Sequence, residues 1–218
     1  MILSRDSSGA ALTPQGSVVA IGAFDGVHLG HQSLLSQLRA RADALGLPAV
    51  VVTFEPLPRQ HFARAPLLRL TPFRERCERI RSFGIDRLLS LRFDDDLAGT
   101  SAEDFIAQVL VQRLQAREVW VGPGFRFGKS RVGDLELLQA AGLQSGFEAR
   151  EVAARTADGE RISSSRIREE LLASEFDAAQ HALGRRYSYC GRVVCGQQLG
   201  GQLGFPTANP RWLQKSQG

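Results

Sequence analysis

The strongest constraint on the fold is an alternation between short β-branched, apolar runs and longer stretches with helically spaced apolar residues. Buried strands are predicted at residues 18–24 and 48–54, further strands at residues 86–91 and 118–121, and a strand-like segment at residues 148–152. Helices are predicted at residues 31–45, after 71–72, after 101, at 135–141 and at 164–173. Strands that alternate with helices imply right-handed crossovers and a mostly parallel sheet, so we expect an α/β fold.

The loops at the carboxyl ends of these strands are where functional residues are expected. Ligands on open parallel sheets bind beyond the carboxyl ends of the strands. The segments that follow Ala23, Phe54 and Val121 are therefore the first places to search for chemistry.

Three sites in the sequence are expected to fix helix ends. Gly46 closes the first helix, because glycine readily adopts the left-handed conformation found there. Thr71 is expected to cap the next helix, with Pro72 in its first turn. Ser101 opens another helix in a capping-box-like arrangement with Asp104.

The sequence pattern changes after residue 184. Residues 187–194 alternate like a strand, and glycines then become dense up to residue 204. This predicts a first domain at residues 1–184 and the opening of a second, β-type domain at residues 185–218. So short a segment cannot bury enough surface to close a barrel by itself, so we expect an incomplete one.

Composition excludes several classes of protein. The formal net charge is only +4 and is scattered along the chain, which argues against a nucleic-acid partner. No apolar run approaches the length of a membrane span, and no secretory signal is evident. Three cysteines, Cys77, Cys190 and Cys195, fit neither a disulfide framework nor a zinc site, so a cytoplasmic location is expected.

The strongest motif is the decapeptide GAFDGVHLGH at residues 22–31, between the first predicted strand and the first predicted helix. His28 and His31 are three residues apart at a helix start, so they share one face. The N–H groups and the macrodipole there favour anions, and Gly26 and Gly30 let the backbone approach a ligand closely. This pattern predicts a phosphate cradle with two tunable donors; the alternatives are a metal pair or surface histidines in a turn.

A second motif, RISSSRIR at residues 161–168, opens the last predicted helix of the first domain. Its hydroxyl groups can cap the helix or face phosphate oxygens, and its arginines can add charge-assisted hydrogen bonds. The alternative is an ordinary N-cap flanked by solvated arginines.

Two further segments follow predicted strands. VGPGFRFG at residues 121–128 is followed by RVGD at residues 131–134, and TFEPLP spans residues 53–58. Both could border a ligand at the sheet end. The alternatives are a turn with two packing phenylalanines and a proline-stiffened exit turn.

Taken in order, these segments resemble the bacterial FAD synthetase family, the bifunctional riboflavin kinases/FMN adenylyltransferases. The order is G-x-FDGVHxGH, TFEPxP, LTxFxE at residues 70–75, VGxxFRFGxxRxGD and ISSxxIR. The tail at residues 196–209 is similar to the G-x-x-x-GRxLGFPTAN signature of the family's kinase domain. The resemblance covers residues 18–210. It implies a Rossmann-like HxGH nucleotidyltransferase domain with a parallel sheet, followed by an incomplete riboflavin kinase-like β-barrel.

The resemblance implies an activity: FMN and ATP would give FAD and pyrophosphate, with Mg²⁺ held largely by the substrate phosphates. No dedicated protein metal site is expected. The catalytic candidates are His28, His31, Ser164 and Arg166. Further residues expected to bind ATP are Phe24, Asp25, Gly26, Gly122, Gly124, Arg161, Ser165 and Arg168. By resemblance alone, the flavin candidates are Phe54, Pro56, Pro58, Phe125 and Phe127, and the kinase-site remnants are Thr207 and Asn209.

The chain departs from the family pattern at three positions. Gly124 stands where the family usually has an acidic or amide residue, Pro123 where it often has an acidic one, and Gly201 where the kinase signature usually has a basic residue. Kinase activity is expected to be lost, because the rest of the barrel is missing. Three alternatives remain: another HxGH adenylyl- or cytidylyltransferase, a non-catalytic flavin-nucleotide binding remnant, and a riboflavin kinase acting through the tail. The sequence does not predict an oligomeric state.

Overall fold

A six-stranded parallel sheet forms the centre of the molecule. The structure is a computed structural model, and it describes residues 1–5, 8–63, 67–157, 159–190, 192–194 and 209–211. The strands run in the order β1-β4-β3-β2-β5-β6, and each neighbouring pair is parallel. Their bounds are β1 Ile2–Ser4, β2 Ser17–Ile21, β3 Ala49–Glu55, β4 Arg87–Arg92, β5 Ala116–Val121 and β6 Glu148–Glu151. The predicted parallel α/β sheet is confirmed, and β1 is an edge strand that the sequence did not predict.

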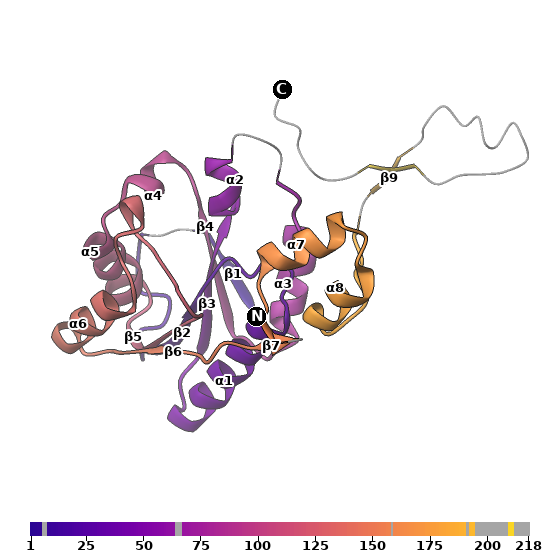
Figure 1. The fold of residues 1–218 in the computed structure, drawn as a ribbon. Helices are drawn as coiled ribbons and strands as arrows, with labels where there is room; N and C mark the ends of the chain where they lie inside the picture. The colour runs from indigo at the N-terminus through magenta and orange to yellow at the C-terminus, as the bar shows by residue number, and fades with distance from the viewer. Residues whose placement is uncertain (6–7, 64–66, 158, 191, 195–208, 212–218) are drawn as a thin grey trace, which may run out of the picture.

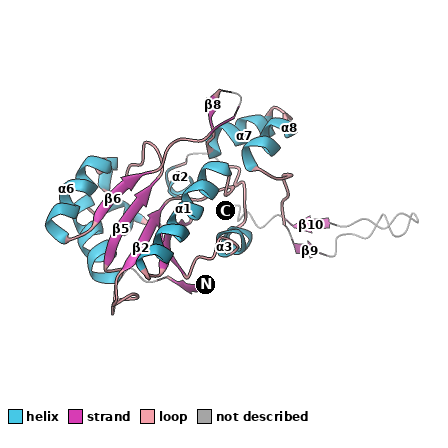
Figure 2. Ribbon diagram, turned by 90° about the horizontal axis from the view of Figure 1, so that it is seen from below, coloured by secondary structure: helices cyan, strands magenta, loops and turns pink. Residues whose placement is uncertain are grey.

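Helices cover both faces of this sheet (Figure 1). α1 (Leu29–Leu45) and α3 (Phe73–Arg81) pack on one face, and Figure 2 shows them together there. On the other face lie α5 (Ala102–Phe105), its π-helical continuation (Ile106–Arg113) and α6 (Leu135–Ser145). The side chains along β2 follow this division, because Val18 and Ala20 face α1 while Val19 and Ile21 face α5 and α6.

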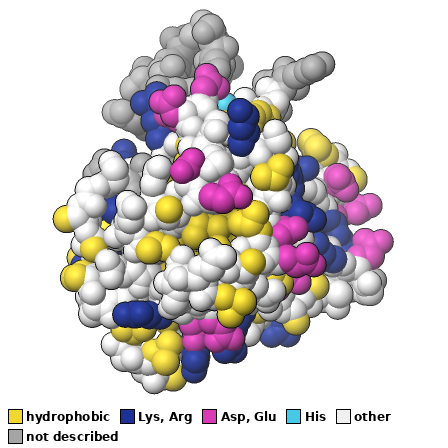
Figure 3. Space-filling model, turned by 90° about the vertical axis from the view of Figure 1, so that its left-hand side faces the viewer, with side chains coloured by type: hydrophobic (Ala, Val, Ile, Leu, Met, Phe, Trp, Pro, Cys, Tyr) yellow, Lys and Arg dark blue, Asp and Glu magenta, His cyan; other side chains and the backbone are white. Residues whose placement is uncertain are grey.

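The outer face over α4 (Asp95–Gly99), α5 and α6 is mixed in character. Figure 3 shows apolar side chains on it among acidic and basic ones. Leu143 on α6 is 91% exposed, which is ordinary for a single surface residue.

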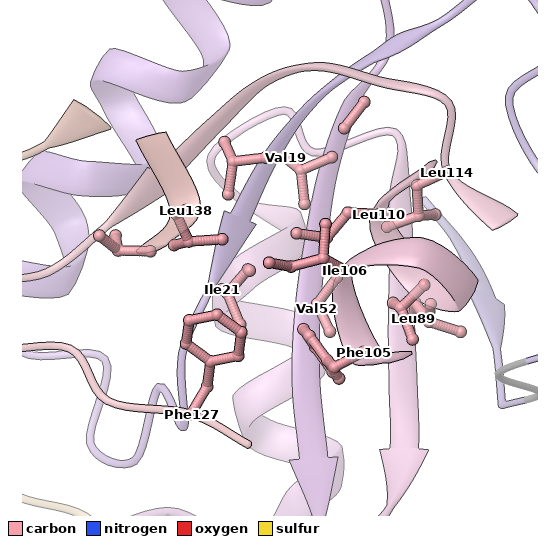
Figure 4. Packing of buried hydrophobic residues seen from close by; sticks show 14 of the residues in the cluster. Val19, Ile21, Val52, Leu89, Phe105, Ile106, Leu110, Leu114, Phe127 and Leu138 are labelled. Atoms are coloured by element: carbon pink, nitrogen blue, oxygen red, sulfur yellow. The ribbon is translucent and has the colours of Figure 1, made fainter. Parts of the chain in front are cut away.

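The apolar layer beneath that face is closely packed. Figure 4 shows Phe105, Ile106 and Leu110 pointing at Val52 and Leu89 of the sheet. All five side chains are buried. This layer anchors the helices whose neighbouring loops border the site.

A smaller helical unit follows the sheet. α7 (Ser164–Leu172) packs against α8 (Phe176–Leu183) around Ile167, Ala182 and Leu183. A short hairpin, β7 (Thr156–Ala157) and β8 (Glu160–Arg161), precedes α7. The sequence did not predict α8, whose buried positions include two small alanines.

Two of the three expected helix ends are confirmed. Gly46 ends α1 with φ of 63°, and the hydroxyl of Ser101 accepts a hydrogen bond from Asp104 N at 2.9 Å. The expected Thr71 cap is wrong, because Pro72 occupies the N-cap position of α3. Thr71 Oγ1 instead accepts a hydrogen bond from Gly26 N at 2.9 Å, so the hydroxyl serves the first loop rather than its own helix.

Beyond residue 190 the structure describes only the backbone of β9 (Arg192–Val194) and β10 (Asn209–Arg211), which pair antiparallel. The strand predicted at residues 187–194 is confirmed only in its last three residues. Asn209 lies in β10, while Gly201 and Thr207 lie outside the described residues. Among the helices described, none has the length and apolarity needed to cross a membrane.

Candidate functional site

A cleft of about 420 Å³ lies beyond the carboxyl ends of the central strands. The strand order reverses at β2, which has β3 on one side and β5 on the other, and ligands bind at such a switch point. The loop after β2 contributes Ala23, Asp25 and His28 to the lining, and the first turn of α1 contributes Gly30 and His31. Other segments contribute Pro58, Arg59, Gly122, Pro123, Arg131, Arg155, Arg161, Ser163, Ser164, Ser165 and Arg168.

The two histidines lie together at the start of α1. His28 is the N-cap residue, and its Nδ1 accepts a hydrogen bond from His31 N at 3.3 Å. Their rings are stacked, with centroids 3.7 Å apart and planes inclined by 18°. A Cβ at Gly30 would lie 3.2 Å from the His28 ring, so glycine leaves room for that ring over the first turn. The expectation that both imidazoles share one face is confirmed.

Both imidazoles are held neutral near pH 7. Burial, followed by the nearby Arg161 guanidinium, lowers the pKa of His28 to about 4. Burial also lowers the pKa of His31 well below its usual range, with smaller contributions from His28 and Arg76. A neutral imidazole retains one N–H donor, so each ring can donate a hydrogen bond to a phosphate oxygen.

The buried carboxylate of Asp25 connects three segments that border the cleft. Its carboxylate accepts hydrogen bonds from Leu70 N at 3.2 Å, Thr71 N at 3.1 Å and Arg168 Nη2 at 2.5 Å. The Asp25 and Arg168 side chains are only 1% and 8% exposed. This buried ion pair therefore fastens α7 and the segment before α3 to the loop after β2.

The neighbours of Asp25 explain why this loop keeps its shape. Gly26 has φ of 84°, and a Cβ there would meet Leu70 Cδ1 at 2.9 Å. Phe24 is fully buried, and its ring lies 5.0 Å from that of His31. Among the first-loop residues expected to bind ATP, Asp25 lines the cleft, whereas Phe24 and Gly26 support it from behind.

The three hydroxyl groups at the start of α7 have different partners. Ser163 caps the helix by accepting from Arg166 N at 3.2 Å, and Ser164 Oγ donates to Asp25 O at 2.8 Å. Ser165 Oγ accepts from Arg59 Nη1 at 2.5 Å. All three serines line the cleft.

Arg166 points away from the cleft. Its guanidinium donates to Ala157 O at 2.9 Å and to Glu170 Oε1 at 2.7 Å. It therefore joins the β7–β8 hairpin to α7, and the structure does not bring it to the histidines. Side chains in the first turn of a helix point in different directions. The serines of this motif therefore line the cleft, while Arg166 holds the hairpin behind it.

The loop after β5 forms the opposite wall. Arg161 Nη2 donates to Pro123 O at 2.5 Å, and Gly124 N donates to Glu151 Oε2 at 3.0 Å. Gly122 lines the cleft, while Gly124 is exposed beside it with φ of 66°. This conformation favours glycine, which accounts physically for its presence at that position.

Three arginines of the cleft were not predicted as site residues: Arg59, Arg155 and Arg131, the last of which belongs to the RVGD segment after β5. Arg59 lies on α2 (Pro58–Phe62), Arg131 in a short 3-10 helix after β5, and Arg155 just before β7. The arginine content of the chain hid them. Asp25 is the single carboxylate among the described residues that line the cleft, and it already has a cationic partner. The cleft is therefore strongly cationic and suited to a polyphosphate.

The flavin candidates are divided between the cleft and the core. Pro58 lines the cleft, and Pro56 is exposed just before it. Phe54 is packed in the core, and Phe127 is buried there with the half-buried Phe125 stacked against it at 5.5 Å.

A second aromatic group lies near Phe54. Phe93 meets it edge-on at 5.8 Å, and His61 and Phe62 pack around Phe93. Phe62 is 65% exposed, so this group reaches the surface beside α2 (Pro58–Phe62). The sequence analysis did not identify Phe62 or Phe93.

The donor set of the cleft does not suit a metal ion held by protein ligands alone. Within the described part of the chain, no three His, Cys, Asp or Glu side chains are grouped to hold one. Asp25 offers oxygen atoms, but Arg168 and two backbone N–H groups bind them.

Comparison with known proteins gives consistent results. Residues 11–166 match the sequence model of the FAD synthetase family, and residues 183–217 match that of riboflavin kinase. The bifunctional riboflavin kinase/FMN adenylyltransferase of Pseudomonas fluorescens is 43% identical over 195 residues, which are 89% of this chain and 63% of that protein. The Escherichia coli K12 protein of the same name is 41% identical over 96% of this chain and 67% of its own length. The chain thus spans about two thirds of these relatives.

Solved structures agree on the fold. The protein described as a macrolide-efflux protein from Streptococcus pneumoniae has a TM-score of 0.83 at 29% identity, over 98% of this chain and 70% of its own. A pantoate-beta-alanine ligase from Francisella tularensis has a TM-score of 0.52 at 12% identity, over 83% of this chain and 78% of its own. The second likeness concerns the fold alone.

Proposed function

Because the chain belongs to the FAD synthetase family, we propose that it is an FMN adenylyltransferase that makes FAD and pyrophosphate from FMN and ATP. The observation that carries this proposal is the stacked, neutral pair His28 and His31 at the start of α1, inside an arginine-lined cleft at the switch point of the sheet. A helix start and cationic walls suit the triphosphate of a nucleotide.

The proposed reaction is an in-line transfer. A phosphate oxygen of FMN forms a bond to the α-phosphorus of ATP, and the bond from that phosphorus to the bridging oxygen breaks. Pyrophosphate leaves with the electron pair, and no covalent bond to the protein forms. The protein therefore acts by positioning the reactants and by stabilising the charge that builds up on the phosphate oxygens.

Each wall of the cleft has a proposed task. His28 and His31 donate N–H groups to the α-phosphate oxygens. Ser164 and Ser165, at the start of α7, with Arg161 opposite, hold the β- and γ-phosphates that leave. We assign Arg166 and Arg168 a supporting role, because their guanidinium groups bind other parts of the protein.

Adenosine and flavin are proposed to lie on opposite sides of the phosphates. The adenosine side is bordered by Asp25 and Gly122. The flavin side is bordered by Pro58, which lines the cleft, and by the exposed Phe62 close to it on α2. An aromatic face there would stack on the isoalloxazine ring.

Magnesium is proposed to enter bound to the phosphates of ATP, as part of the substrate. The cationic cleft and the engaged Asp25 carboxylate favour this over a site built from protein ligands. Residues 1–184 are proposed as the adenylyltransferase domain, and residues 185–218 as a riboflavin kinase-like segment. The reaction would take place in the cytoplasm, where ATP is available.

A panel of substrates tests the class of reaction. The purified chain is incubated with ATP or CTP and with FMN, riboflavin or 4′-phosphopantetheine, and the products are separated by chromatography. We expect the pair ATP and FMN to give FAD, and every other pair of substrates in the panel to give no product. Nucleotide binding without any product would support the alternative of a non-catalytic remnant. A product from phosphopantetheine or CTP would identify another HxGH transferase.

A further inference from the structure

Arg76 is a fully buried cation behind the cleft. It lies on α3 and has no exposed side-chain surface. Its Nη1 donates to Ala23 O at 3.0 Å, and its Nη2 donates to Phe54 O at 3.0 Å and to Glu55 Oε2 at 2.8 Å. Its guanidinium also lies 5.3 Å from the centre of the Phe73 ring. A buried arginine is costly unless such partners satisfy it.

The partners of Arg76 belong to the two loops that shape the cleft. Ala23 lies in the loop that leads from β2 to His28 and His31, and it lines the cleft itself. Phe54 and Glu55 end β3, directly before the segment that carries Pro58. One guanidinium thus joins the carboxyl ends of two neighbouring parallel strands, so it fixes the separation of the loops that follow them.

A second arginine extends this network on the β3 side. Arg69 donates to the other oxygen of Glu55 at 2.8 Å and also to the amide oxygen of Gln60 on α2. The position of α2, and with it the cleft wall at Pro58, therefore depends on Glu55. Arg76 is the one member of this network without any exposed side-chain surface.

We propose that Arg76 is a positioning residue for nucleotidyl transfer: it fixes the loop of His28 and His31 relative to the Pro58 segment, and its buried cation adds to the effects that disfavour a positive charge on His31. This inference rests on the proposed function. Arg76 contacts no substrate in this account, and it acts through the loops and through His31.

The charges around these groups support the electrostatic part. His31 is stacked on His28, and both His28 and Arg76 disfavour a positive charge on it, in addition to burial. Arg76 itself is flanked by Glu55 and Asp25, which favour its charge, and by Arg69, which disfavours it. Cys77, its neighbour on α3, also favours the charge slightly. Although burial lowers the pKa of Arg76, an arginine stays protonated.

Two substitutions break the same ion pair but should not shift the titration of His31 in the same direction. Arg76→Met removes the cation, so His31 should bind a proton at higher pH, and kcat/KM for ATP should fall about 10–100-fold because the loops shift. Glu55→Gln leaves the cation and removes the charge that offsets it. His31 should then titrate at the same or a lower pH, whereas a purely structural role would move both variants alike.

Arg76→Lys separates geometry from charge. A lysine keeps the cation, but its single ammonium cannot match the fork that reaches the carbonyl groups of Ala23 and Phe54. We expect a wild-type titration of His31 with a reduced kcat/KM. Ile80→Ala is the matched control, because Ile80 is fully buried on the same helix and its loss lowers stability without changing any charge.

The experiment is an NMR titration of the His31 ring, assigned by its absence in His31→Gln, together with steady-state kinetics and thermal unfolding of each variant. An unchanged His31 titration in Arg76→Met overturns the inference, as does a kcat/KM within about threefold of wild type. So does an equal titration shift in Ile80→Ala. If Arg76→Met does not fold, wild-type kinetics in Arg76→Lys overturns the inference. A wild-type chain that makes no FAD refutes the proposed function instead, and the titration, which needs no substrate, still tests the charge of Arg76.

Discussion

His28→Asn should remove a large part of the acid sensitivity of the fold. Asparagine can still cap α1, because its side-chain oxygen can accept the hydrogen bond from His31 N. It does not titrate, so the substitution removes the buried imidazole while keeping the helix end. In the native chain the pKa of His28 is lowered to about 4.

The sign and size follow from proton linkage. Between pH 6.5 and 4 the unfolded chain binds a proton at His28 that the folded chain does not, so stability is lost as the pH falls. One pKa unit corresponds to 1.36 kcal/mol, which gives about 2 kcal/mol by pH 5 and about 3 kcal/mol by pH 4. The contribution of His28 is fully present above pH 6.5. His31 acts in the same direction, and because His28 is one of the causes that lower the pKa of His31, removal of His28 reduces the acid sensitivity further.

Urea unfolding followed by circular dichroism at pH 7.5, 6.5, 5.5 and 5.0 measures this difference. Wild type should lose about 2 kcal/mol more than His28→Asn between pH 7.5 and 5.0. His181→Asn, which removes an exposed histidine on α8, is the control for losing an imidazole without burial. Parallel losses in wild type and His28→Asn would refute the argument from burial.

Three further substitutions probe chemistry, backbone and charge. His31→Ala should lower kcat for FAD formation by about 10²–10³, which is about 3–4 kcal/mol of transition-state stabilisation, and a loss below about tenfold would remove it from the catalytic assignment. Gly128→Ala should lower the free energy of unfolding, measured in urea, more than Gly146→Ala does. Both glycines have positive φ. A Cβ at Gly128 would meet the backbone of α5 at 2.7 Å, whereas nothing lies within 4 Å of a Cβ at Gly146. Asp25→Asn should cost about 3–5 kcal/mol, because it leaves a buried arginine without its anion. Asp43→Asn in the exposed pair on α1 should cost at most about 0.5 kcal/mol, and equal costs would contradict the role given to Asp25.

The parts of the fold that were predictable from sequence are those with strong local patterns. Five segments predicted as strands are parallel strands, Gly46 ends α1, and Ser101 begins α5 as expected. Thr71 shows the limit, because a hydroxyl before a helix can cap it or bind a distant backbone group. Gly26, 45 residues earlier in the chain, took that hydroxyl, and no local pattern reveals such a partner.

The site residues also include some that local sequence predicts and some that it does not. His28 and His31 were predictable because a helix start fixes both their spacing and their face. Arg166 shares a motif with Ser164 and Ser165, yet its side chain points to the hairpin, since neighbouring residues of a helix leave in different directions.

The missed residues are brought to the site by tertiary structure. Arg59, Arg131 and Arg155 lie on separate segments that meet only when the sheet forms. Arg76 lies in the middle of a helix, where an arginine ordinarily faces water. Nothing in the sequence around it indicates that it is fully buried.

The most direct test of the central claim is the formation of FAD by the purified chain. FMN and riboflavin are each incubated with Mg·ATP, and flavins and pyrophosphate are quantified against time. We predict one pyrophosphate for each FAD made from FMN, and no FMN from riboflavin. Bound nucleotide with no FAD would contradict the account and leave the cleft as a binding site without catalysis.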